Sequence, residues 1–196
     1  MNYTDVHDKL TDYRRQIAAI REKMRDTLAD VEPQAVDDYT FATLDGTVHL
    51  SDFFGEHDDL IVIHNMGATC SYCTLWADGY NGIHRHVVTR AGFMVTSPDH
   101  PSAQKKLAQS RGWTFPMVSH VGSSFAKDMG YVSAKGGWLP GASVFRREHD
   151  TIVRVSDTGF SPGDDFCSLW HFFDLLPGGA GERPDVQRKP SCCSDH

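Results

Sequence analysis

The chain has 196 residues, of which 40% are hydrophobic and 23% charged, a composition typical of one globular domain with extensions. Its formal net charge of −7 argues against a nucleic-acid partner, because such partners usually require a basic surface. Five cysteines are too few, and odd in number, for a disulfide-stapled secreted scaffold, while the chain start lacks the apolar core of a signal peptide and no run reaches the ~18 apolar residues of a membrane span. We therefore expect a cytoplasmic protein with no membrane partner.

The first predicted element is an amphipathic helix over residues 4–29. Its apolar residues recur at spacings of three and four, which is the helical period; they are Leu10, Tyr13, Ile17, Ile20, Met24 and Leu28. Pro33 disfavours helical backbone at the residue before it, so we expect residues 1–34 to form an N-terminal helical extension. The apolar face predicts packing on the domain or a contact in a homodimer.

Residues 35–177 are predicted to form one α/β domain. The Asp45-Gly46 pair indicates a two-residue hairpin. The apolar run 60–66 favours a strand buried on both faces. A helix over 71–90 follows, then a strand over 92–97 and a helix over 97–112. This alternation predicts a parallel β-α-β unit.

The second half of the domain is predicted to add antiparallel strands. Residues 113–130 favour a loop, a short strand and a helical turn, and residues 139–157 alternate as a hairpin. A last helix is expected over 161–176, with Cys167 as an inert buried thiol. Residues 178–196 are rich in Gly, Pro and charge, which predicts a flexible tail. Within the tail, Cys192 and Cys193 are exposed thiols, with a metal site including His196 or an electron relay as alternatives.

Cys70 and Cys73 stand where the apolar strand passes into the helix over 71–90. A helix N-terminus carries unpaired N–H groups and partial positive charge, which lower the pKa of a thiol placed there. The spacing lets the second sulfur reach the first, so Cys70 would attack a disulfide and Cys73 would resolve the mixed disulfide. Two alternatives remain open: a metal site, or two ordinary core cysteines.

Four segments together resemble the DUF899 family of predicted thioredoxin-like dithiol-disulfide oxidoreductases. They are LSDFFGEHDDLIVIHNM, CSYCTLWADGYNG, GWTFPMVS and LPGASVFRR, within residues 38–176. The resemblance implies a thioredoxin-like fold, a central mixed sheet flanked by helices. Ser71 and Tyr72 stand between the cysteines where thioredoxin has Gly and Pro, so general thioredoxin-type reductase activity does not follow.

The same resemblance implies a cis-proline beside the Cys pair, just before an antiparallel strand. Pro140 leads into the alternating strand, whereas Pro116 lies in FPMVSHVGSSFAKDMG, which resembles a peroxiredoxin-like segment that precedes this point. We therefore expect Pro140 to be the cis-proline that presents a backbone edge to substrate. His64 occupies the place of the buried carboxylate of thioredoxins, six residues before Cys70. It would take the proton of the resolving thiol or serve as a core histidine.

The expected function is thiol-disulfide oxidoreduction with Cys70, Cys73, Pro140 and His64 as the catalytic set. Tyr72 and Trp76 are candidate substrate-binding residues. No cofactor is expected, since no dinucleotide or phosphate-binding motif is present. The expected partners are a protein or small-molecule disulfide and a cellular thiol reductant. The alternative function is a zinc or copper carrier that uses the Cys pair with His64, His84, His86 or His120.

Overall fold

The structure is a computed structural model that describes residues 2–181, and the chain divides into two compact units, Met1–Gln34 and Ala35–His196. The first unit contains the expected long helix, α1 (Tyr3–Ala29). Asn2 begins it: the Asn2 side chain accepts the Asp5 N–H, and the Asp5 carboxylate accepts the Asn2 N–H in return. No residue of α1 is buried. Within residues 2–181, no helix is both long and apolar enough to cross a membrane.

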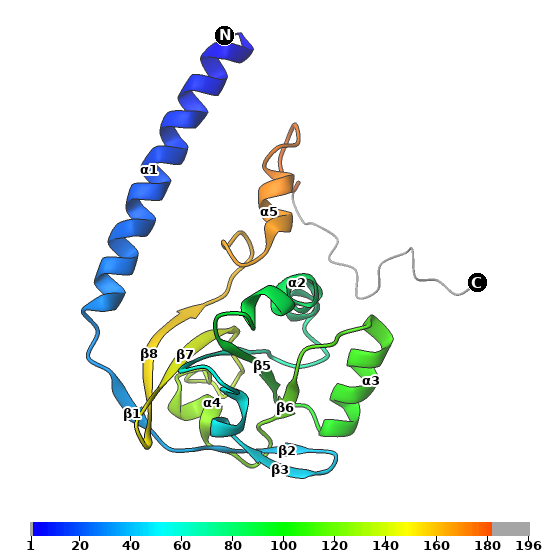
Figure 1. Ribbon diagram of the computed structural model, residues 1–196. Coiled ribbons are helices and arrows are strands. Elements are labelled where there is room, and N and C mark those ends of the chain that lie inside the picture. The colour runs from blue at the N-terminus through cyan, green and yellow to red at the C-terminus, as the bar shows by residue number, and fades with distance from the viewer. Residues whose placement is uncertain (1, 182–196) are drawn as a thin grey trace. The chain divides into compact units, whose positions relative to one another are not determined.

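The second unit is built on one mixed eight-stranded sheet (Figure 1). Strands β4, β5 and β6 run parallel, and β7 joins β4 antiparallel. The order across the sheet is β1 (Gln34–Val36), β8 (Thr151–Gly159), β7 (Gly141–Glu148), β4 (Asp59–His64), β5 (Gly92–Ser97), β6 (Met117–Ser119), β2 (Thr40–Thr43) and β3 (Gly46–His49). The expected β2–β3 and β7–β8 hairpins and the parallel β-α-β unit are present.

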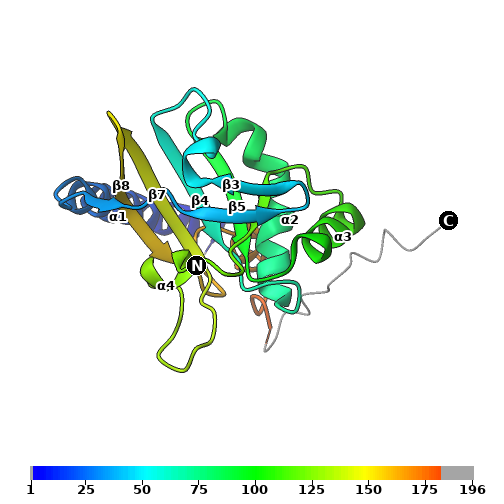
Figure 2. The same ribbon diagram turned by 90° about the horizontal axis from the view of Figure 1, so that it is seen from below.

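Helices cover both faces of this sheet, with α2 (Ser71–Val87), α3 (Pro101–Arg111) and α5 (Ser168–Phe173) packing on one core. The 3₁₀ helix η1 (Leu50–Phe53) and α4 (Phe125–Asp128) belong to the other. Figure 2 shows α4 on one side of the strands and α2 and α3 on the other. Because side chains alternate along a strand, Ile61 and Ile63 pack toward α2, while Leu60 and Val62 pack toward α4.

Helix α2 tolerates two glycines in its middle, and helix α5 begins later than expected. Helix α2 runs unbroken through Gly79 and Gly82, where an added side-chain carbon would meet no atom within 4 Å, so tertiary packing of the rest of the helix overrides their weak helix propensity. Helix α5 begins at Ser168 rather than near 161, because Gly163 adopts a positive φ of 93° that an α-helix does not allow. Residues 182–196, with Cys192, Cys193 and His196 of the predicted tail, lie outside the described residues.

Candidate active site

Cys70 is the N-cap residue of α2, at the end of the loop that leaves β4. Its backbone is extended, with φ −88° and ψ 107°, and its sulfur accepts the backbone N–H of Cys73 at 3.1 Å. A serine or aspartate oxygen usually fills this role and satisfies one unpaired N–H of the first helical turn. Here a thiol fills it, so the local signal that starts the helix also places a sulfur at its positive end.

The two thiols respond in opposite directions to this arrangement. A hydrogen bond from the Cys73 thiol, and the N–H groups of Cys73 and Tyr72, lower the pKa of Cys70 to about 6 against the opposing effect of burial. The hydrogen bond to Cys70 and burial raise the pKa of Cys73, whose sulfur also accepts the Met66 N–H at 3.4 Å. Cys70 is partly exposed and Cys73 is 2% exposed. The outer sulfur is therefore a thiolate near neutral pH, and the inner one a buried thiol.

A tightly packed crevice, here termed the Cys73 crevice, lies behind the pair and leaves no room for a water molecule. Its lining consists of Ile63, His64, Asn65, Cys73, Trp76, Tyr80, Pro140 and Phe160. Pro140 thus stands beside the inner cysteine, as the sequence places it. The cis bond is a wrong expectation, because no cis peptide bond occurs in residues 2–181. Leu139 donates its N–H to the Tyr131 carbonyl, and the Pro140 carbonyl accepts the Phe160 N–H, so the backbone is paired on both sides of the trans proline.

His64 lines the same crevice, but its ring packs in the core on the α4 side of the sheet. The ring stacks on Tyr131 with centroids 3.6 Å apart and on Phe125 at 5.2 Å. Nε2 lies 2.9 Å from the Ser143 hydroxyl, while Nδ1 is buried without a partner in the described residues. Burial holds the pKa of His64 well below its usual value, so the ring is neutral. Its role as proton acceptor for Cys73 stays a prediction.

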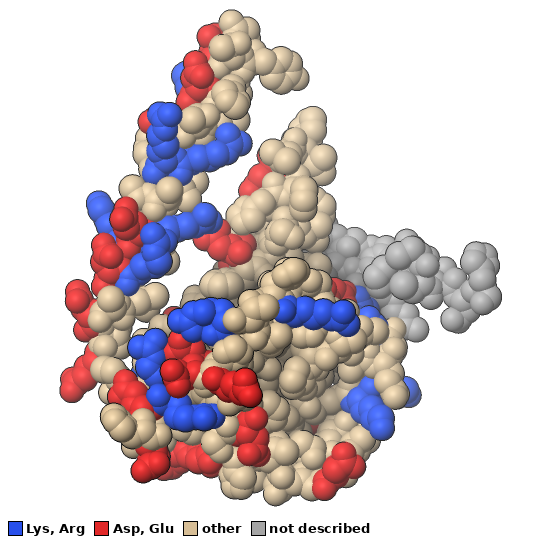
Figure 3. All heavy atoms as spheres, viewed as in Figure 1, with Lys and Arg blue, Asp and Glu red and all other residues tan. Residues whose placement is uncertain are grey.

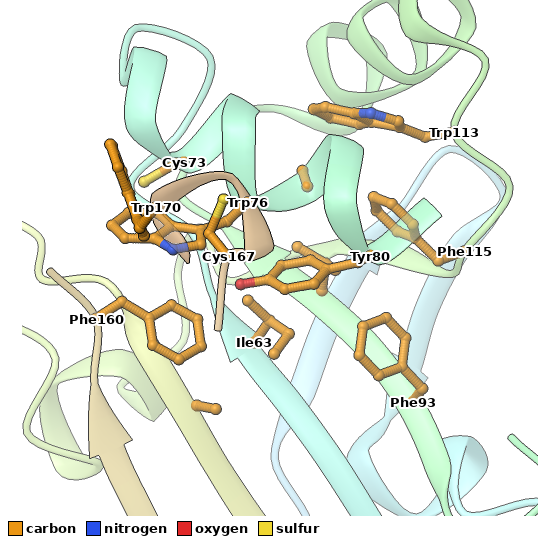
Figure 4. Close-up of a cluster of buried hydrophobic side chains, with 13 residues drawn as sticks. Ile63, Cys73, Trp76, Tyr80, Phe93, Trp113, Phe115, Phe160, Cys167 and Trp170 are labelled. Carbon is orange, nitrogen blue, oxygen red and sulfur yellow. The ribbon is translucent and has the colours of Figure 1, made fainter. Parts of the chain in front are cut away.

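Aromatic side chains form the wall of the crevice on the α2 side. Trp76 is 3% exposed and donates its ring N–H to Asp164 at 3.3 Å, and its ring contacts Phe160. Tyr72 is partly exposed, between Trp76 and Trp170. Figure 4 shows Cys73 and Trp76 on α2 close to Trp170 and Phe160. Only Tyr72 of the two candidate substrate contacts has open surface, and the binding role of both stays a prediction.

Tyr80 is a crevice residue that sequence reasoning did not assign to the site. It follows Cys73 by seven residues, which is two helical turns, so both side chains share one face of α2. Its hydroxyl is buried and has no partner in the described residues. Burial, with Asp164, Cys73 and Cys167 nearby, raises the pKa of Tyr80, so it is a neutral hydrogen-bond donor. The spacing from Cys73 is the signal that could have identified it.

The family model described as "Bacterial protein of unknown function (DUF899)" matches residues 6–193. The chain belongs to the DUF899 family. No curated protein matches the chain.

Several solved structures similar to this DUF899 protein are peroxiredoxins. Reduced Prx3 of Vibrio vulnificus in complex with H2O2 is 18% identical with a TM-score of 0.53, over 68% of this chain and 87% of that chain. A cysteine-to-serine mutant of PrxQ of Xylella fastidiosa is 14% identical with a TM-score of 0.56, over 67% and 87%. Peroxidoxin BcpB of Mycobacterium tuberculosis is 20% identical with a TM-score of 0.51, over 66% and 86%. These likenesses confirm the thioredoxin-like fold.

Asp78 and Asn81 of the segment WADGYNG, which carried much of the resemblance to DUF899, have a structural role, while Trp76 and Tyr80 of the same segment line the crevice. The Asp78 carboxylate accepts two hydrogen bonds from the Arg111 guanidinium and one from the Trp113 ring at 2.9 Å. Asn81 donates to the Gly112 carbonyl and accepts from the Thr114 N–H, both at 2.9 Å. These contacts fasten α2 to the end of α3 and the loop after it. Neither Asp78 nor Asn81 lines the Cys73 crevice.

The histidines of the metal-carrier alternative are dispersed in this DUF899 chain. His84 is buried, with Nδ1 near the Asn81 carbonyl and its ring against Phe115. His86 is exposed on α2, and His120 is buried between Thr96 and Trp138. Residues 2–181 contain no group of three His, Cys, Asp or Glu side chains suited to a metal ion. Cys167 is buried among the aromatic residues of the α2 core, and burial raises its pKa.

Proposed function

We propose that this DUF899 protein is a thiol-disulfide oxidoreductase that works through Cys70 and Cys73. The observation that carries the proposal is the hydrogen bond from the Cys73 N–H to the Cys70 sulfur at the start of α2. It supports a thiolate that is partly exposed at neutral pH, with a second thiol directly behind it. The thiolate is the attacking species in disulfide exchange.

The reaction balances in two steps. The Cys70 thiolate attacks one sulfur of the substrate disulfide, forming a mixed disulfide and releasing the other substrate sulfur as a thiolate, which takes a proton from water. Cys73 then loses its proton and attacks the Cys70 sulfur. The Cys70–Cys73 disulfide forms, the remaining substrate thiolate leaves, and two electrons have moved to the substrate. A cellular thiol reductant would restore the dithiol.

Proton removal from Cys73 is the demanding step, because burial and the hydrogen bond to Cys70 raise its pKa. Consumption of the Cys70 thiolate in the mixed disulfide removes that hydrogen bond, which favours ionisation of Cys73. The Met66 N–H then supports the new thiolate. His64, which lines the same crevice as Cys73 and whose Nδ1 is unpartnered in the described residues, is the proposed proton acceptor. Tyr72, which is partly exposed, would contact the substrate around Cys70, with the buried Trp76 ring packed against it.

A second candidate is thiol peroxidase activity, favoured by the peroxiredoxin structures that share the fold. In this reaction the Cys70 thiolate attacks one peroxide oxygen and becomes a sulfenic acid, and the other oxygen leaves as hydroxide. Cys73 then condenses with the sulfenic acid, forming the disulfide and releasing water. Both candidates need the same two sulfurs and differ in the electron acceptor.

The test measures the rate of oxidation of the reduced protein by a disulfide peptide and by hydrogen peroxide. Cys70→Ser should abolish both reactions, and Cys73→Ser should accumulate the mixed disulfide with the peptide. Cys167→Ser is the matched control, since this buried thiol lies outside the pair. Equal oxidation of the wild type and Cys70→Ser by both oxidants would refute the proposal. A peroxide rate far above the disulfide rate would select the peroxidase.

A further inference from the structure

Helix α1, described by itself, carries an apolar stripe along its length. The apolar side chains from Val6 to Met24 are between 36% and 60% exposed. The residues from Tyr3 to Thr27 follow a heptad repeat. The a positions are Tyr3, Leu10, Ile17 and Met24, and the d positions are Val6, Tyr13, Ile20 and the polar Thr27. A heptad repeat sustained over three to four heptads is the pattern of a coiled coil. Thr27 ends the stripe, and its hydroxyl bonds back to the Lys23 carbonyl.

The width of this stripe distinguishes a helical partner from a lipid surface. The large apolar side chains are confined to a and d positions until Leu28, and the small Ala18 and Ala19 lie at b and c. Such a narrow stripe is the seam of a coiled coil, whereas a helix that lies on a globular core or on lipid presents a wider apolar face. A second helix that inserts its own side chains between those of α1 is the occupant that fits.

The charges beside the stripe are of one sign. Lys9 and Lys23 occupy g positions and Arg14 and Arg21 occupy e positions, next to the seam. All acidic residues of the helix occupy c or f positions, away from the seam; they are Asp5, Asp8, Asp12, Glu22 and Asp26. Figure 3 shows charged side chains of both signs along this helix beside uncharged surface. Side chains at e and g face the partner helix and set its identity.

A second copy of α1 is a poor match for this rim. In a parallel pair, Lys9 of one helix would face Arg14 of the other. In an antiparallel pair, Lys9 would face Lys23, and Arg14 would face its own copy. Like charges at these positions are unfavourable. This basic rim, formed by Lys9, Arg14, Arg21 and Lys23, therefore disfavours the homodimer contact that was one expectation from the sequence.

We propose that α1 is one half of a heterotypic coiled coil, and that its partner is a helix with apolar a and d positions and acidic e and g positions. The seam supplies the apolar contact and the basic rim supplies the selectivity. An α-helix rises 1.5 Å per residue, so the seam offers roughly 36 Å of contact. This inference is independent of the redox chemistry of the second unit.

The test uses the full-length protein and two synthetic peptides of about four heptads, with Ile at a and Leu at d. One peptide carries Glu at e and g, and the other carries Lys there. Binding is measured by fluorescence anisotropy, with circular dichroism to show that each variant remains folded. The acidic peptide should bind at least tenfold more tightly than the basic one, with an affinity that falls as salt is added. Equal binding of both peptides, or no binding, would overturn the proposal.

Variants separate the seam from the rim. Ile17→Asp should abolish binding of the acidic peptide. Arg14→Glu with Lys23→Glu leaves two basic and two acidic residues beside the seam and should abolish the preference between the two peptides. Arg15→Glu with Arg25→Glu is the matched control, because it makes the same charge change at f and b positions and should keep the preference. Loss of the preference in both double variants would refute a role for the rim.

Two further measurements exclude other occupants. Analytical ultracentrifugation should show no dimer that depends on Ile17. A dimer that Ile17→Asp dissociates would assign the seam to a second copy and overturn the proposal. Vesicles of anionic phosphatidylglycerol should not bind the protein through Ile17. Binding of these vesicles in preference to the acidic peptide would assign the face to lipid and overturn the proposal.

Discussion

The backbone N–H of Cys73 points at the sulfur of Cys70 across 3.1 Å, so the residue that carries the second thiol also stabilises the first as a thiolate. One helical turn thereby makes two cysteines unequal. The outer sulfur is ready to react, and the inner sulfur stays protonated until the outer one has been consumed. The order of attack follows from this geometry.

The first prediction concerns the ionisation of Cys70. Because its pKa is lowered to about 6, alkylation of Cys70 by iodoacetamide should rise with pH around a midpoint near 6, instead of the usual ~8.5. Cys73→Ala removes the thiol hydrogen bond, the largest cause of the shift, and should move the midpoint upward. The measurement is the rate of alkylation at Cys70, followed by mass spectrometry between pH 4 and 10. A midpoint above 8 in the wild type would contradict the assigned thiolate.

The second prediction concerns close packing beside Pro140. A β-carbon added at Gly141 would lie 2.4 Å from the Thr158 carbonyl oxygen and 2.4 Å from the Tyr131 ring. Gly141→Ala should therefore lower the free energy of unfolding by about 3 kcal/mol, since the backbone cannot make room without moving. Gly159 faces Gly141 across the β7–β8 pair and has open space around it, so Gly159→Ala is the matched control. Chemical denaturation of both variants checks the result, and similar losses would count against it.

The third prediction concerns the ion pair that fastens α2 to α3. The Arg111 side chain is 3% exposed and depends on Asp78 for its charge partner. Asp78→Ala leaves a buried cation alone and should cost about 3 kcal/mol of unfolding free energy. Arg90→Ala is the comparison, because the Arg90 side chain is 76% exposed and its partner Asp59 keeps Arg146; this change should cost less than about 1 kcal/mol. If Asp78→Ala lowered the free energy of unfolding by no more than Arg90→Ala does, the buried pair would not be required for stability.

The fourth prediction concerns stability in mild acid. Burial lowers the pKa of His120 to about 4 and that of His64 well below 6.5, so the folded state resists protons that the unfolded chain accepts. Their contribution to the free energy of unfolding is complete above pH 6.5 and is lost progressively as the pH falls below that value. His120 alone accounts for a loss of up to about 3 kcal/mol by pH 4. His120→Asn can keep the contact with Thr96 and should give a shallower pH dependence. Denaturation between pH 7 and 4 measures the slope, and an unchanged slope would refute the assignment to His120.

Patterns within a few residues could be predicted from the sequence. The apolar run of β4, the Cys pair at the start of α2, and the Asp45-Gly46 turn all depend on local backbone chemistry, and all three are present in the structure. The long N-terminal helix was equally clear from its period. These features are local because each depends on side chains within one or two turns of the chain.

The side of the sheet on which each strand residue lies could not be predicted. The run from Leu60 to Ile63 is apolar at every position, so no alternation distinguishes the α2 side from the α4 side. The face on which the His64 ring lies could therefore not be predicted from the sequence. The trans bond at Pro140 and the crevice position of Tyr80 depend on partners such as Phe160, which is far away in the chain. Only tertiary packing determines them.

The connection between β1 and β2 limits the shape of the sheet. Only residues 37–39 separate the two strands in the chain, yet five strands lie between them in the sheet order. A flat sheet would set them about 29 Å apart, at about 4.8 Å per strand, while this connection reaches only about 14 Å. The sheet must therefore curl, and Figure 2 shows β2 and β3 crossing the other strands. The outer strands β1 and β3 have only three and four residues, which makes them poor templates for intermolecular β-pairing.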